Sequence, residues 1–164
     1  MALFVFEDEL NRMINLKLYG SYAYKELSYI FDGDHVAMKS VAAKLRKRAD
    51  ELQEKAEHMM SYLNTRGGMF VATKITKPPS LDSTQLSIEN TITYVSTLEE
   101  VTNKSVLKLY NSAVNDPELQ GFLQDNCLHN HVAYMKELRD LMTNVKRVGE
   151  GLGQFLIDKK YFSQ

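Results

Sequence analysis

The chain has 164 residues, a formal net charge of −1 and one cysteine, Cys127. This length suits a single domain over residues 1–164 with its own core. The near-neutral charge gives no sign of a nucleic-acid or membrane-surface partner. One cysteine excludes an internal disulfide and fits a reducing compartment. No apolar run approaches the ~18 residues of a membrane span, and the start lacks the pattern of a signal peptide. We therefore expect a cytoplasmic protein, although a secreted chain that has lost its signal would look the same.

Apolar residues recur at helical spacing in four long segments. The strongest pattern, in residues 36–66, alternates by four and three without interruption; its inward positions are Met38, Ala42, Leu45, Ala49, Leu52, Ala56, Met59 and Leu63. The predicted helices are, in order, 4–31, 36–66, 86–115 and 117–148, with a short fifth helix at about 152–161. The first helix has a second apolar stripe, which favours packing against another subunit as well as the bundle.

The connections between these helices predict how they are arranged. Gly33 is expected to make a left-handed turn after the first helix, Gly67 to end the second, and Asp116 with Pro117 to begin the fourth. A thirty-residue helix is ~45 Å long, and an extended chain covers ~3.3 Å per residue. The connection between the second and third helices can therefore run the full length of a bundle and leave them parallel. The fold class is all-α, a four-helix bundle with one long crossover.

Each predicted helix places a polar or unusual residue at an inward position near one level of the bundle. These residues are Lys17 and Tyr24, Leu52 with Lys55 one turn away, Glu99, and His131. Bundles that hold two irons use a glutamate from two helices and Glu-x-x-His from the others, whereas these positions supply one carboxylate, Glu99. A protonated lysine has no lone pair and repels a dication. The pattern therefore favours an ion-pair cluster of Glu99 with Lys17 or Lys55, oriented by Tyr24, over a metal site.

The charged run from Lys44 to Glu57 is interpreted as a solvated helix face. It lacks the interleaved aromatic residues of a single-stranded nucleic-acid site, and the chain as a whole is not basic. Nucleic-acid binding is therefore not expected.

Several longer stretches carry a specific resemblance. They are INLKLYGSYAY (14–24), FDGDHVAMK (31–39), NTRGG (64–68), KITKPP (74–79), STLEEVTNKS (96–105), NDPEL (115–119), KELRDLMTN (136–144) and GLGQFLIDKK (151–160). In these stretches, and in its spacing and crossover, the chain resembles ferritin subunits along nearly its whole length. The resemblance implies a homo-oligomeric shell of twenty-four subunits around an iron mineral, with co-assembly with catalytic heavy-type chains as a further possibility.

The resemblance also bears on the polar positions. Heavy-type ferritin subunits have Glu at the position of Lys17, Glu-x-x-His at Leu52 and Lys55, and Gln at His131, while Glu99 and Tyr24 match. The chain is thus similar to light-type subunits, which lack ferroxidase chemistry. We therefore expect a structural, non-catalytic cage subunit that is not an enzyme.

Other positions bear on where iron would go. Acidic residues that line the family's threefold channels correspond to Gly121 and Gln124. Glu51, Glu54 and Glu57 could hold iron as mineral or weakly bound ions, although a salt-bridged surface explains them equally well. The metal-ligand candidates are therefore Glu99 and these three glutamates. Two alternatives stay open: a scaffold or carrier cage without iron, and a remodelled iron oxidase that uses Glu99 and His131.

Overall fold

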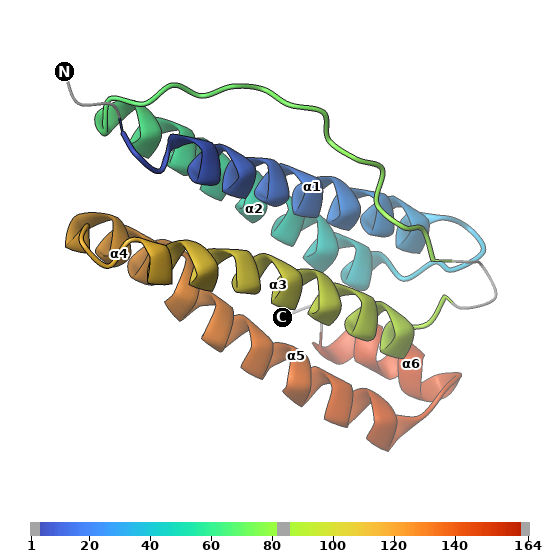
Figure 1. The fold of residues 1–164 in the computed structure, drawn as a ribbon. Helices are drawn as coiled ribbons and strands as arrows, with labels where there is room; N and C mark the ends of the chain where they lie inside the picture. Colours follow the sequence, from blue (N-terminus) through green and yellow to red (C-terminus); the bar gives the residue numbers. More distant parts are fainter. Residues whose placement is uncertain (1–3, 82–85, 162–164) are drawn as a thin grey trace.

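The computed structural model describes residues 4–81 and 86–161 of the chain, and the regular secondary structure within them is entirely helical (Figure 1). The elements are α1 (Glu7–Asp32), α2 (Lys39–Thr65), α3 (Ile88–Ser112), α4 (Pro117–Leu123), η2 (Gln124–Leu128), α5 (His129–Val148), α6 (Leu152–Leu156) and η3 (Ile157–Tyr161). The predicted all-α class, the four long helices and the short fifth helix are confirmed. The ends of the expected domain, residues 1–3 and 162–164, and residues 82–85 of the crossover lie outside the described residues.

The fourth predicted helix contains a feature that its apolar pattern did not reveal. Between α4 and α5 the chain makes a π-helical turn, η2, whose flanking residues Leu123 and His129 both keep right-handed helical angles. The axis therefore continues from Pro117 to Val148 with one wider turn. Such turns are often found at functional sites, and η2 contains the buried Cys127.

The long crossover runs beside the bundle from one end to the other, so α2 and α3 point the same way (Figure 1). Side chains of α1 hold it: Asn11 Nδ2 donates to the Met69 carbonyl at 3.0 Å, and Asn15 Nδ2 donates to Thr73 Oγ1 at 2.9 Å. Extended backbone has no internal hydrogen bonds, and the side-chain amides supply some of the missing partners: Asn11 Nδ2 for the Met69 carbonyl, and Asn15 Nδ2 for the Lys74 carbonyl at 3.2 Å. The prediction of parallel second and third helices is confirmed.

The helix ends follow the expected chemistry at two of three places. Asp116 accepts a hydrogen bond from the Leu119 amide at 3.1 Å, with Pro117 in the first turn of α4. Gly67 has φ +79° just after α2. The expected left-handed Gly33 is wrong: its φ is −67°. The turn is closed instead by Ala37, with φ 53°, whose amide donates to the Gly33 carbonyl at 2.8 Å.

The apolar core is divided into two clusters, one toward each end of the bundle. One includes Leu27, Leu45 and Val95, and the other includes Leu10 and Leu63. Burial of each such side chain contributes about 1.5–3 kcal/mol, which helps offset the cost of burying polar groups at the level between the clusters. No helix in the described part of the chain is long and apolar enough to cross a membrane.

Candidate functional site: a polar cluster inside the bundle

The centre of the cluster is an ion pair between α2 and α3. Glu99 Oε1 accepts hydrogen bonds from Arg48 Nη2 at 2.9 Å and from Arg48 Nε at 3.1 Å. The two residues are only 6% and 8% exposed. A buried charge is tolerated when it is both paired and hydrogen-bonded, and each of these two residues meets that condition.

Two tyrosines from the other helices complete the network. Tyr24 of α1 donates its hydroxyl hydrogen to Glu99 Oε1 at 2.9 Å, and its oxygen lies 3.0 Å from the Tyr134 hydroxyl of α5. The Arg48 guanidinium lies 3.9 Å from the centre of the Tyr134 ring, within the range of a cation–π contact. Every long helix of the bundle therefore contributes one side chain to the same connected group.

Burial determines the protonation of this network. It raises the pKa of Tyr24 well above its ordinary value and that of Tyr134 to about 12, so both keep their hydroxyl protons at neutral pH. Burial alone would lower the pKa of Arg48, but Glu99 and the two tyrosines outweigh it, and the net shift is upward. The arginine therefore stays charged.

A small cavity of about 10 Å³ lies beside the ion pair. Its lining combines Arg48 and Glu99 with Lys17, Lys55, Thr102, Asn103, Val106, Cys127 and His131. This volume is about what one water molecule needs. Burial lowers the pKa of Lys55 to about 8, with nearby Arg48 and Lys17 adding to the effect. Burial also lowers the pKa of His131 and raises that of Cys127.

The structure brings most of the sequence-predicted cluster together. Lys17, Lys55, Glu99 and His131 line one cavity, and Tyr24 bonds Glu99, while Leu52 is a buried part of the adjacent apolar core. The partner of Glu99 differs from the expectation, because Arg48 forms the ion pair in place of either lysine.

Sequence reasoning missed Arg48 because it lies within the charged run assigned to the solvated face. A signal was present in the spacing: Arg48 lies four residues before Leu52 and seven before Lys55, on one stripe of α2. The run is therefore not uniformly solvent-facing. Its Lys47 is exposed whereas Arg48 is buried.

The other candidate ligands lie on the outside of α2. Glu54 and Glu57 are exposed, and the Glu51 side chain is 43% exposed and lies 3.4 Å from Arg48 Nη1. Within residues 4–81 and 86–161, no three His, Cys, Asp or Glu side chains form a group that could hold a metal ion. Gly121 lies in α4 and is partly exposed, and Gln124 begins η2 and is exposed.

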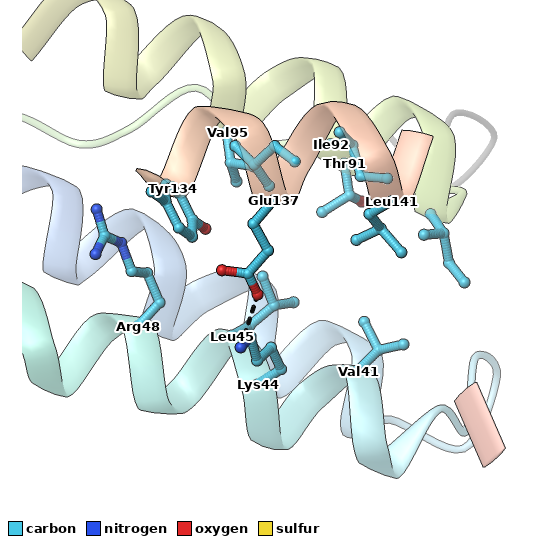
Figure 2. A pocket seen from close by; sticks show the side chains of 12 residues that line it. Val41, Lys44, Leu45, Arg48, Thr91, Ile92, Val95, Tyr134, Glu137 and Leu141 are labelled. Atoms are coloured by element: carbon cyan, nitrogen blue, oxygen red, sulfur yellow. Dashed lines mark ion pairs between the residues drawn. The ribbon is translucent and has the colours of Figure 1, made fainter. Parts of the chain in front are cut away.

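A second, apolar pocket of about 40 Å³ lies between α2, α3 and α5 (Figure 2). Its walls include Leu45, Val95 and Leu141, and the buried Thr91 hydroxyl, which has no hydrogen-bond partner among the described residues. Arg48 and Tyr134 border it on the side of the polar cluster. An ion pair of 2.9 Å joins the two helices α2 and α5 across it, between Lys44 and Glu137.

A four-helix bundle with parallel second and third helices, one long crossover and a polar cluster drawn from all four helices defines the class of ferritin-like helical proteins. A family model described as a ferritin-like domain matches residues 7–148. The chain is 36% identical to soma ferritin of Lymnaea stagnalis, covering 96% of this chain and 90% of that protein. It is also 36% identical to the ferritin middle subunit of Aquarana catesbeiana, covering 93% and 89%. The chain belongs to the ferritin family.

Family membership corrects one expectation. The chain was expected not to be an enzyme, because Lys17, Leu52 and Lys55 replace ligands inside the bundle. Its relatives are ferritins, and ferritins are ferroxidases, so the family points to an enzyme that oxidises iron(II). Three side chains at one place do not decide the activity of a whole protein. Membership also implies iron handling, and ferritins in general assemble into oligomeric cages.

Proposed function

We propose that this chain is an iron-storage subunit of a ferritin cage. Residues 1–164 would form one domain, and twenty-four copies would assemble, alone or with heavy-type chains, in the cytoplasm. The single cysteine supports a reducing compartment. The match over nearly the whole chain is the observation that carries the storage function.

The polar cluster would then act as a structural ion-pair network at the place where other bundles hold two irons. Iron(II) prefers several anionic oxygen ligands, whereas this cavity has one carboxylate, and Oε1 of Glu99 already accepts three hydrogen bonds from Arg48 and Tyr24. Lys17 and Lys55 add positive charge to the same small space. These features support a light-type arrangement at this one position.

Iron would instead collect on carboxylates along the exposed face of α2. Glu51, Glu54 and Glu57 lie within two turns of that helix and provide hard oxygen ligands. Their exposure suits weakly bound iron or a growing mineral. The iron(II) oxidation that the family indicates would then use such surface carboxylates.

A measurement of iron content tests the storage function. The assembled protein is loaded with iron(II) in air, and its iron-to-protein ratio is measured after gel filtration. Wild-type cages should retain many irons per subunit. Combined Glu51→Gln, Glu54→Gln and Glu57→Gln substitutions should lower that ratio, whereas the same change at the exposed Glu89, Glu100 and Glu150 should not. Cages that elute without iron would support the alternative of an iron-free scaffold or carrier.

A second candidate is a remodelled oxidase site inside the bundle. It is favoured by one observation: Glu99 and His131 line the same cavity and together offer a carboxylate and an imidazole. Burial lowers the pKa of His131, which keeps its imidazole neutral and able to bind a metal. Locating iron in the crystal distinguishes this candidate from the surface carboxylates.

A further inference from the structure

The small cavity beside Glu99 has an unusual balance of charge. Its lining includes three cations, Lys17 of α1 and Arg48 and Lys55 of α2, and Glu99 is the one carboxylate among its lining residues. A second carboxylate, Glu51, reaches Arg48 only from the solvent edge, at 3.4 Å. Because Glu99 is committed to Arg48, the two lysines have no carboxylate of their own in the cavity.

Lys17 is the most informative of these side chains. It is 6% exposed, yet within the described part of the chain it has neither an ion pair nor a side-chain hydrogen bond. Its Nζ is not among the fully buried polar atoms that lack a partner, so the ammonium group keeps some contact with solvent while most of the side chain is enclosed. Because charges in such places are normally paired, a cation on the cavity wall without an ion pair leaves positive charge that a small anion in the cavity would neutralise.

We propose that the cavity lined by Lys17, Lys55 and Asn103 binds one small inorganic anion of the halide class, such as chloride. The site is distinct from the apolar pocket between α2, α3 and α5. This inference rests on the proposed absence of irons from the same place.

The size and the donors of the cavity support a single-atom anion. Its volume of about 10 Å³ is close to that of one water molecule, which is too small for phosphate or sulfate. The ammonium groups of Lys17 and Lys55 donate hydrogen bonds and neutralise the charge. The Asn103 amide, which makes no hydrogen bond among the described residues, is a neutral donor on the same wall. Charge-assisted bonds of this kind are the stronger class.

Bromide provides the test, because it replaces chloride and is located by anomalous diffraction. Crystals of the assembled protein are soaked in sodium bromide at the physiological ionic strength of about 0.15 M. We expect a bromide peak between Lys17, Lys55 and Asn103. The peak should be lost in Lys17→Met and kept in Lys104→Met, which removes an exposed lysine from the helix that carries Asn103.

Three results would overturn the anion site. Wild-type crystals could show no bromide in the cavity, the Lys17→Met protein could keep an equal peak, or bromide could bind only at exposed lysines. If Lys17→Met does not assemble, the wild-type map alone decides. A parallel iron(II) soak separates the two proposals: iron bound to Glu99 contradicts both, whereas a cavity empty in both soaks contradicts only the anion site.

Discussion

Removing the charge of Glu99 should destabilise the protein more than removing any exposed carboxylate. In Glu99→Gln the side-chain oxygen can still accept hydrogen bonds from Arg48 and Tyr24, so the substitution isolates the charge. Arg48 would remain 8% exposed beside two lysines, and its one remaining ion pair among the described residues would be with Glu51 at the solvent edge. Breaking a buried ion pair by removing one partner costs about 3–5 kcal/mol.

Thermal unfolding at one scan rate measures this cost. For a domain of this size, 1 kcal/mol shifts Tm by about 2–4 °C, so Glu99→Gln should lower Tm by about 6–20 °C. The matched control is Glu137→Gln, whose ion pair with Lys44 is 40% exposed on the carboxylate side and should contribute about 1 kcal/mol or less.

A double variant checks the mechanism. Adding Arg48→Met to Glu99→Gln removes the uncompensated charge, so the double variant should recover part of the lost Tm, because buried pairs replaced as a unit cost little. Equal Tm values for Glu99→Gln and Glu137→Gln would refute the reasoning, and so would a double variant that is less stable than the sum of the two single changes.

Three further predictions follow from other parts of the bundle. A Cβ added at Gly153 would clash with the Val148 carbonyl oxygen, so Gly153→Ala should lower Tm and displace α6. A Cβ added at Gly121 would meet no described atom within 4 Å, so Gly121→Ala should leave Tm unchanged or raise it. Asp116→Ala removes both the N-cap of α4 and the 2.6 Å ion pair with Arg66. The free energy of unfolding should therefore fall by more than the ~1 kcal/mol that a cap alone contributes, and the same thermal unfolding assay measures this loss. The folded state disfavours the protonated form of Lys55, whose pKa falls from 10.5 to about 8. Because the unfolded chain then binds more protons, the contribution of this residue to stability should rise with pH from about 8 upward. A series of Tm measurements from pH 7 to 10 should therefore be flatter for Lys55→Met than for wild type.

The fold could be predicted from the sequence because its signals are local and repeated. The unbroken four-three pattern of α2 fixes its inward face, and the length of the crossover sets the direction of α3. The π-helical turn at Cys127 could not be predicted, because its residues keep the apolar spacing of an ordinary helix. The turn at Gly33 was missed for a similar reason: a glycine permits a left-handed residue but does not require one, and Ala37 adopts it.

The candidate site was predicted in part. The inward positions of Lys17, Tyr24, Glu99 and His131 follow from periodicity alone. The pairing of Glu99 did not follow, since it depends on which of several cations reaches the carboxylate in three dimensions. A guanidinium matches two donors to one carboxylate and packs on the Tyr134 ring, which gives Arg48 an advantage over a lysine that a helical pattern does not display.

The position of iron in the crystal tests the central claim most directly. Crystals of the assembled protein soaked in iron(II) without oxygen are measured at the iron absorption edge. Our account predicts iron along the face of α2 that carries Glu51, Glu54 and Glu57, and none within bonding distance of Glu99, whose contacts with Arg48 and Tyr24 should persist. Two iron peaks bound to Glu99, with Arg48 displaced, would contradict it.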